Sequence, residues 1–183
     1  FLFFFFSLFS VINDVLLTFL CFPYPLFLFS LNNILSYNSF QLSVFLQGIA
    51  GNKIYNANNI DNTGMAAAYN QTTDVLKRWQ GEGTSNSMPR AVFGDPNQNT
   101  RVSDRFVENG SYLRLKNITL SYTFPKQWLQ KAQIENARLS LSCENVATIT
   151  GYSGFDPEVG INGIDQNRYP ISRTFSLGLN FNF

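Results

Sequence analysis

The end of the chain alternates strictly between apolar and polar side chains. Successive side chains of a β-strand point to opposite faces, so this pattern predicts a strand with one apolar and one polar face. An amphipathic helix, with its period of 3.6 residues, does not produce it. The polar and small positions are Thr174, Ser176, Gly178, Asn180 and Asn182, and the apolar positions are Phe175, Leu177, Leu179, Phe181 and Phe183.

Three earlier segments repeat this alternation: residues 40–47, 112–124 and 137–145. Their polar positions are mostly Ser, Thr, Asn and Gln. An antiparallel sheet with one solvated face explains the pattern and is compatible with a soluble sandwich or barrel. The uncharged polar face and strand lengths of about 9 to 11 residues favour a barrel that crosses a membrane. Arg114 and Lys116 fall on the apolar side of this alternation, where we expect them to mark the end of a membrane-facing stripe.

The connections between these predicted strands alternate in length. Residues 51–110 form a long connection, 125–136 a short one and 146–172 another long one. Outer-membrane barrels join their strands by long outer loops and short periplasmic turns, so we expect the last strand to run inward. Within the first long connection, good helix formers predict a helix from Asp61 to Trp79.

Composition argues against catalysis, metal binding and nucleic-acid binding. The chain contains no histidine, which excludes Ser-His and Cys-His nucleophile pairs and histidine-ligated metals. Cys21 and Cys143 are far apart and form no metal-binding motif. A net charge of +1 without a basic stretch disfavours a DNA or RNA partner. We therefore predict no enzyme activity, no catalytic residue, no metal and no cofactor.

Asp156 and Glu158 lie two residues apart in the second long connection. A calcium site or an acid/base pair is conceivable for two such carboxylates. No EF-hand pattern or third ligand accompanies them, so we expect a solvated loop end.

The start of the chain has a different composition from the rest. Ten of the 19 phenylalanines lie in the first 29 residues, and Asp14 is the single charge in the first 52. Hydropathy permits a membrane helix within Phe1 to Leu31, but no basic residue flanks it and Pro23 and Pro25 follow. Three interpretations stay open: unrelated or wrongly framed upstream sequence, which we favour, a hydrophobic helix, or apolar strands. We therefore predict that residues 1–38 lie outside the native domain and that residues 39–183 form it.

The order of several motifs resembles the C-terminal end of SusC/RagA-type TonB-linked outer-membrane proteins. The resemblance covers about residues 40–183 and leaves out residues 1–38. The matching stretches are Phe40 to Gly48, Gly51 to Asn56, Leu76 to Trp79 with Pro89 and Arg90, Arg105 to Tyr122, Gly151 to Gly160, Tyr169 with Pro170, and Arg173 to Phe183.

This resemblance implies an all-β fold: the C-terminal antiparallel strands of a transmembrane outer-membrane β-barrel, with a short helix in a long outer loop. It implies a TonB-dependent importer of oligosaccharides or peptides in the outer membrane of a Gram-negative bacterium. The implied partners are a SusD-like lipoprotein, the TonB complex, the substrate and outer-membrane lipid. About four closing strands alone should not transport, because the rest of the barrel and its plug are missing. Candidate outer-loop contacts are Tyr69, Trp79, Tyr152 and Phe155, and the closing strand with its terminal Phe183 resembles a barrel-assembly signal.

Two other classes of protein fit the sequence. One is a soluble β-sandwich module that binds a carbohydrate or another ligand through its loop aromatics. The other is a helical membrane anchor joined to a β domain. Dependence on detergent separates the barrel from the sandwich, and the sequence encoded upstream of Phe40 separates the barrel from the anchored domain.

Overall fold

The computed structural model describes residues 24–130 and 133–183, which form two compact units. The sheet unit comprises residues 24–52, 109–159 and 168–183, and the loop unit comprises residues 53–108 and 160–167. Within the described residues, no helix has both the length and the apolar composition needed to cross a membrane.

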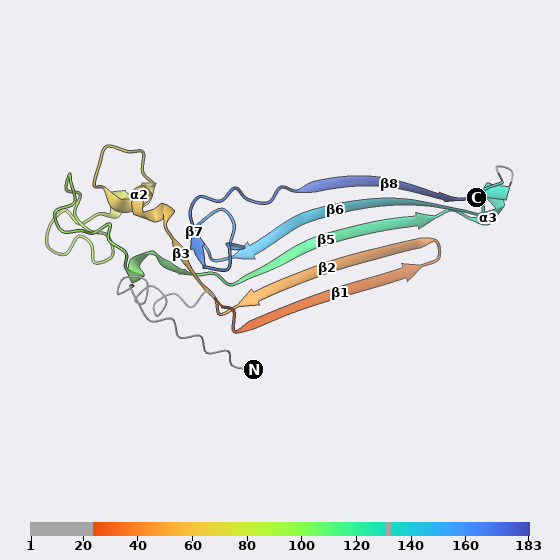
Figure 1. Cartoon of the computed structure of the whole chain (residues 1–183), viewed down its shortest axis with the longest axis horizontal. Coiled ribbons are helices and arrows are strands. Elements are labelled where there is room, and N and C mark those ends of the chain that lie inside the picture. Colours follow the sequence, from red (N-terminus) through yellow and green to blue (C-terminus); the bar gives the residue numbers. More distant parts are fainter. Residues whose placement is uncertain (1–23, 131–132) are drawn as a thin grey trace, which may run out of the picture. The chain divides into compact units, whose positions relative to one another are not determined.

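The sheet unit is a single antiparallel sheet of five strands lying side by side (Figure 1). The predicted all-β class is confirmed, and the four strands inferred from alternation are all present. Their bounds differ from the predicted ones. The strands predicted at residues 40–47 and 137–145 are longer, and those predicted at 112–124 and 174–183 end one residue earlier. In spatial order the strands are β1 (Phe27–Tyr37), β2 (Phe40–Ala50), β5 (Tyr112–Thr123), β6 (Asn136–Thr150) and β8 (Thr174–Asn182).

The register places apolar residues of neighbouring strands in rows on one face. One row joins Leu42, Leu120, Leu141 and Leu177, each paired with the next across four strands. These side chains are not buried within the chain: Leu141 is 51% exposed and Leu177 is 72% exposed. The adjacent row on the opposite face is polar or small: Gln41, Ser121, Ser140 and Gly178. The sheet therefore has one apolar and one polar face, as the alternation predicts.

Strand β1 lies inside the segment predicted to fall outside the domain. It pairs with β2 along its whole length, from Phe27 opposite Ala50 to Tyr37 opposite Phe40. The ring of Phe29 covers Gly48, where an added Cβ would come within 2.0 Å of the ring. Aromatic cover of a strand glycine fixes the pairing of the two strands. The described sheet thus begins at Phe27. The membrane helix considered as one alternative for Phe1 to Leu31 falls largely on residues 1–23, which lie outside the described residues.

A β-bulge interrupts the centre of the sheet at Lys116. The register of β5 shifts between Leu115 and Asn117 against both β2 and β6. On β6 the irregularity includes Asn145, whose φ is 53°. A bulge turns the following side chains to the other face. Our expectation that Arg114 lies on the apolar side is therefore wrong: Leu115 takes the apolar position opposite Leu46, and Arg114 lies on the polar face.

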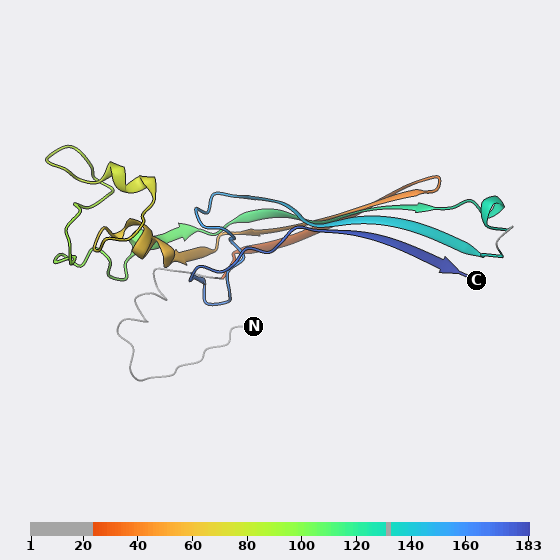
Figure 2. The same cartoon turned by 90° about the horizontal axis from the view of Figure 1, so that it is seen from above.

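The connections alternate in length as predicted. At one end of the sheet, the turn at residues 38–39 joins β1 to β2, and residues 124–135, which include α3 (Lys126–Leu129), join β5 to β6. At the other end, residues 51–111 join β2 to β5 and residues 151–173 join β6 to β8. Figure 2 shows the same strands from above. Long and short connections therefore emerge from opposite ends of the sheet.

The loop unit has a small core of its own. Its elements are β3 (Lys53–Asn56), α2 (Asn58–Gly64), the 3-10 helices η1 (Thr73–Lys77) and η2 (Asp104–Phe106), β4 (Val107–Asn109) and β7 (Ile164–Asp165). Strand β3 runs parallel to β7 and lies between it and β4. The rings of Tyr55 and Phe106 meet edge to face at a centroid distance of 6.1 Å. Ala57, Ile60, Val107 and Ile164 pack against them.

The helix predicted from Asp61 to Trp79 is wrong in its extent. Helix α2 begins earlier and ends at Gly64, and Met65 has a left-handed φ of 54°. The chain then folds back, because the backbone N–H of Thr72 donates to the carbonyl of Asn62 at 3.0 Å. In the later part of the predicted helix, only the short 3-10 helix η1 is helical. Local helix propensity is a weak influence, and here the fold of the loop overrides it.

Candidate functional site

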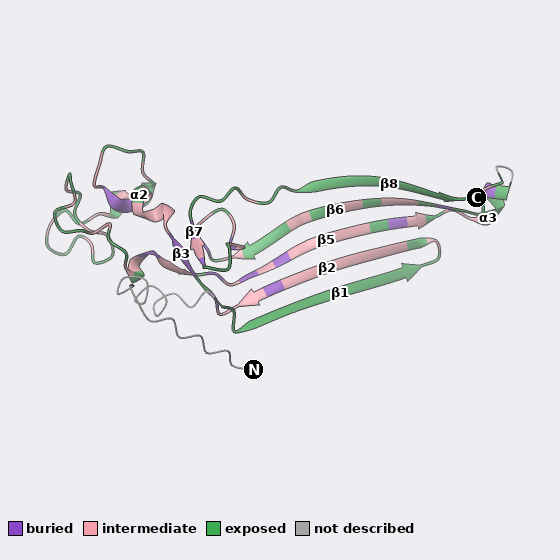
Figure 3. Ribbon diagram, in the orientation of Figure 1, coloured by how far each residue is buried: buried purple, intermediate pink, exposed green. Residues whose placement is uncertain are grey.

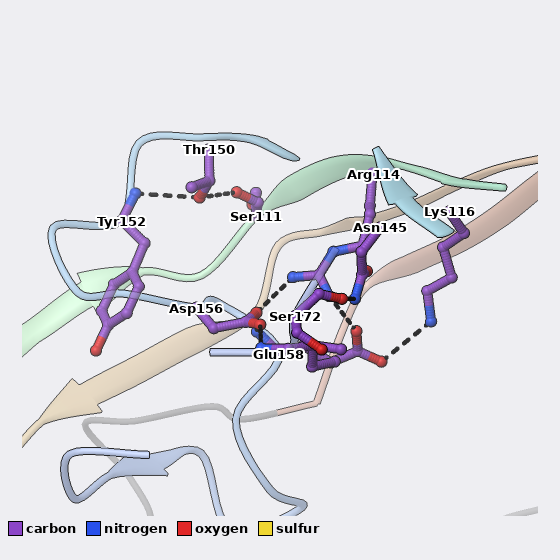
Figure 4. Close-up of polar contacts among 10 residues, drawn as sticks. Ser111, Arg114, Lys116, Asn145, Thr150, Tyr152, Asp156, Glu158 and Ser172 are labelled. Carbon is purple, nitrogen blue, oxygen red and sulfur yellow. Dashed lines mark hydrogen bonds and ion pairs between the residues drawn. The ribbon is translucent and has the colours of Figure 1, made fainter. Parts of the chain in front are cut away.

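A cluster of ion pairs on the polar face of β5 holds the connection that follows β6 (Figure 4). Arg114 Nη1 donates to Glu158 Oε2 at 2.9 Å, and Arg114 Nη2 donates to Asp156 Oδ1. The Arg114 side chain is only 2% exposed. Lys116 Nζ lies 3.3 Å from Glu158 Oε1, at the solvent-accessible margin of the cluster. The bulge at Lys116 therefore brings both cations to the two carboxylates.

Asp156 organises the loop around this cluster. Its Oδ1 accepts from the backbone N–H of Glu158 at 2.9 Å, and its Oδ2 accepts from the N–H of Ile171 at 3.5 Å. Burial disfavours the charged carboxyl, but these N–H donors and the Arg114 guanidinium outweigh it and hold the pKa of Asp156 below its usual value. Our expectation of a solvated loop end is therefore wrong for Asp156, which is 10% exposed.

Further hydrogen bonds tie the same connection to its flanking strands. Asn145 Nδ2 donates to the carbonyl of Ser172 at 3.1 Å, and Thr150 Oγ1 donates to the carbonyl of Ser111 at 2.9 Å (Figure 4). The N–H of Tyr152 donates to Thr150 Oγ1 at 3.1 Å. The loop is thus fixed on β5 and β6 near both of its ends. A cavity of about 210 Å³ lies beside the cluster, with Phe155, Pro170 and Arg173 in its wall.

A second, larger pocket lies within the loop unit. Its volume is about 430 Å³, and its wall includes Trp79 and three arginines, Arg90, Arg101 and Arg105. The rest of the wall is mostly serine, asparagine and glutamine. The guanidinium of Arg90 lies 6.0 Å from the centroid of the Trp79 ring, a cation–π contact. Polar donors, cations and one aromatic ring thus meet in a single concave surface, which we call the arginine pocket.

Arg105 forms the inner wall of the arginine pocket. Its Nη2 lies 3.3 Å from the carbonyl of Thr63 and 3.0 Å from the sulfur of Met88. Its guanidinium also lies 5.3 Å from the ring centroid of Phe106, which belongs to the core of the loop unit. The core therefore positions this side chain.

The four predicted contact residues lie in different environments. Trp79 lines the arginine pocket, Phe155 is 76% exposed beside the ion-pair cluster, and Tyr69 is 69% exposed and lines two smaller cavities of the loop unit. Tyr152 is buried, only 6% exposed, and its ring packs over Gly154. Its ring is therefore unavailable for contacts in this conformation.

The closing strand β8 is exposed along nearly all of its length within the described part of the chain (Figure 3). Phe175, Leu177 and Leu179 lie on β8, and each is more than half exposed. Phe181 ends the alternation within β8, and Phe183 follows the strand. All five occupy the apolar face or its continuation.

Sequence reasoning missed the pairing of Arg114 with Asp156 and Glu158. A signal was present, because two cations cannot continue an apolar stripe at Arg114 and Lys116 without either ending it or shifting the register. Within residues 24–130 and 133–183, no three carboxylate or thiolate side chains come together as metal ligands. The carboxylates of the cluster face cations instead.

Comparison with known proteins gives a consistent group of relatives, although no protein-family model matches the chain. The chain is 34% identical to TonB-dependent receptor P3 of Formosa agariphila over 172 residues, covering 88% of this chain and 17% of that protein. It is 32% identical to TonB-dependent receptor SusC of Bacteroides thetaiotaomicron, covering 85% of this chain and 15% of that receptor. The chain therefore spans about a sixth of the length of these relatives.

A solved structure has the same fold. The RagAB peptide importer in its open-open state matches with a TM-score of 0.70 at 29% identity, covering 85% of this chain and 17% of the matched one. The match to TonB-dependent receptor P3 covers 88% of this chain, whereas residues 39–183 make up less than four fifths of it. That match therefore extends into the segment before residue 39.

Proposed function

Because this chain belongs to the family of SusC/RagA-type TonB-dependent receptors, we propose that it forms the C-terminal strands of an outer-membrane nutrient importer. The observation that carries the proposal is the register of the sheet. It places apolar rows on one face and polar rows on the other, and leaves the outer edges of β1 and β8 without a paired strand among the described residues. Both edges require further strands in lipid, where every backbone group must find a partner.

In this proposal the apolar face meets lipid and the polar face lines the lumen. The two long connections face the cell exterior, and the ion-pair cluster holds residues 151–173 against the lumen wall. The whole receptor binds a peptide or oligosaccharide, closes with a SusD-like lipoprotein and takes energy from the TonB complex. The names of the relatives support these roles, since one is TonB-dependent receptor SusC and another is a chain of the RagAB peptide importer. The protein performs binding and gated release rather than bond chemistry.

Cysteine labelling on intact cells tests the topology. In a full-length receptor carrying this segment, cysteine at Ser153 or Ser85 should react with a membrane-impermeant reagent, whereas cysteine at Gln130 should not. Gln130 follows α3 in the short connection and is exposed, so burial would not explain its protection. Labelling at Gln130 alone would reverse the proposed orientation.

Expression of residues 40–183 alone separates the barrel from a soluble binding module. We expect insoluble material, because the strands cannot satisfy their own edges. A monodisperse, sheet-rich product obtained without detergent would replace the proposal with the β-sandwich alternative.

We also propose that β8 and the terminal Phe183 form a barrel-assembly signal. Deleting Phe183 from a full-length receptor should sharply reduce the inserted amount while synthesis continues. Replacing Phe181 and Phe183 by serine should act in the same direction. Insertion and uptake at parental levels in the double variant would contradict this role.

The native domain then begins near Phe27 instead of residue 39. Two observations support this boundary: the full pairing of β1 with β2, and a relative's match that reaches into the segment before residue 39. Gly48→Val tests it in the full-length receptor, because a side chain there would collide with Phe29. If Phe27 to Tyr37 is a native strand, the variant should assemble poorly, whereas Ala50→Val should assemble normally.

A further inference from the structure

We propose that the arginine pocket binds a carboxylate group carried by the imported nutrient. This inference rests on the proposed function and names a substrate class for it. Its basis is an excess of unpaired positive charge in one concave surface: Arg90, Arg101 and Arg105 line the pocket, and no aspartate or glutamate does.

The three arginines differ from Arg114, the buried cation of the sheet unit. Arg114 has two carboxylate partners. Within the described part of the chain, none of the three pocket arginines forms an ion pair. Guanidinium groups bind carboxylates through two parallel, charge-assisted hydrogen bonds. The arginine pocket therefore offers three such donors without a resident acceptor.

Arg105 gives the strongest local argument. Its Nη2 has acceptors, but its Nη1 is buried and has no hydrogen-bond partner among the described residues. A buried donor without a partner costs free energy, so an additional acceptor oxygen at this guanidinium is favourable. The charge of the Asp95 carboxylate acts on this guanidinium. That carboxylate is already engaged by the N–H of Asn99 and by the N–H and hydroxyl of Thr100.

The remaining wall of the pocket suits a polar ligand that carries such an anion. Asn97, Gln98 and Asn99 supply amides, and Trp79 supplies an aromatic ring beside Arg90. Amides can bind hydroxyl or peptide groups, and an aromatic ring can pack against a sugar or side chain. The shared chemistry is therefore an acidic oligosaccharide or an acidic peptide, and the experiment below separates the two sources.

The test uses the full-length receptor purified with its lipoprotein partner. The acidic probes are an oligogalacturonate and a glutamate-rich peptide, and their neutral counterparts are an oligogalactoside and the corresponding glutamine peptide. Binding is measured by calorimetry for the parent, for the double variant Arg90→Gln/Arg101→Gln and for Lys77→Gln. Arg90 and Arg101 are exposed, so their replacement should preserve the fold. Lys77 lies outside the pocket and pairs with Asp74 at 2.9 Å, so it controls for loss of charge in the same loop.

We expect the parent to prefer the acidic member of at least one pair. The double variant should bind that probe at least about tenfold more weakly, the magnitude expected for losing charge-assisted hydrogen bonds. Its affinity for the neutral member should stay unchanged, and Lys77→Gln should bind like the parent. The pair that responds identifies the source of the anion as saccharide or peptide.

Three outcomes would overturn the inference. The parent could bind neither acidic probe, it could bind acidic and neutral probes equally, or the double variant and Lys77→Gln could lose affinity equally. The proposed function fails separately, if the parent receptor is absent from the outer membrane or if its deletion leaves nutrient uptake unchanged.

Discussion

The sheet and the loop unit place their large apolar side chains in opposite environments. The loop unit buries its own aromatics: Phe106 is 1% exposed and Tyr55 is 4% exposed. The sheet leaves Leu177 72% exposed and Phe175 70% exposed on its apolar face. The loop unit therefore has an ordinary buried core, whereas none of the residues that the structure describes covers the apolar face of the sheet.

The polar face of the sheet completes the contrast. Its central cation, Arg114, is buried and paired, whereas Leu120 of the same strand is 44% exposed on the apolar face. The polar face therefore buries a charged side chain, the reverse of an ordinary core. Variants of a full-length receptor that carries the segment can test the loop unit and the two faces of the sheet separately.

The largest effect is expected from Arg114→Met. Removing one partner of a buried ion pair leaves the other charge without compensation, at a cost of about 3–5 kcal/mol. The loop at residues 151–173 should lose its attachment to β5 and be cleaved faster by protease added to intact cells. Lys116→Gln is the control, since Lys116 is 30% exposed and such pairs contribute less than about 1 kcal/mol. Equal protease resistance of Arg114→Met and parent would show that the ion pairs do not hold the loop.

Phe106→Ala should act on the loop unit alone. Truncating a fully buried phenylalanine typically costs about 3–5 kcal/mol, and local relaxation places our expectation at the lower end. Hydrogen exchange should increase in residues 53–108 and stay unchanged in β5 and β6. Phe93→Ala, at an 84% exposed position of the same unit, should have little effect. Increased exchange throughout the sheet would contradict the independence of the two units.

Leu177→Lys tests the environment of the apolar face. A lysine facing lipid near the bilayer centre costs about 2–4 kcal/mol, so the amount of folded receptor in the outer membrane should fall. Ser176→Lys places the same charge on the opposite face of β8 and should be tolerated. A water-exposed sheet would accept both lysines equally, and that result would contradict the proposal that the apolar face meets lipid.

The smallest effect concerns acid. Because the pKa of Asp156 is lower in the folded protein than in the unfolded chain, the stability it provides is complete above the ordinary aspartate pKa of about 3.9. This stability is lost as pH falls through the lower, folded-state value. Protease protection of residues 151–173 should therefore persist at neutral pH and decline only in strong acid. Asp156→Asn should reduce protection at neutral pH and weaken its dependence on acid, and loss of protection near neutrality in the parent would contradict this.

The sequence predicted those parts of the fold that depend on strict alternation. Residues 174–183 and 40–47 alternate clearly, and both became strands. Strand β1 escaped detection because Leu28, Ile34 and Asn33 blur the pattern beside a phenylalanine-rich run. Alternation is a local signal, whereas β1 is specified by its pairing with β2.

The candidate sites were harder to predict for the same reason. Trp79 could be chosen from its residue type and loop position, but its grouping with Arg101 and Arg105 requires the loop to fold back at Met65. Arg114 meets Asp156 across 42 residues, and only the bulge turns it to the correct face. Local patterns specify neither event.

Among the described residues, the outer edges of β1 and β8 have no paired strand, and in the proposed receptor they mark a place where the barrel could be divided. Each edge presents a row of backbone donors and acceptors to which another strand can be added, as in donor-strand complementation. A receptor divided just before Phe27 would therefore consist of two polypeptides with matching unpaired borders. Such a split receptor could be used as an assembly reporter, in which uptake returns only when both parts are made together and close the barrel across β1 and β8.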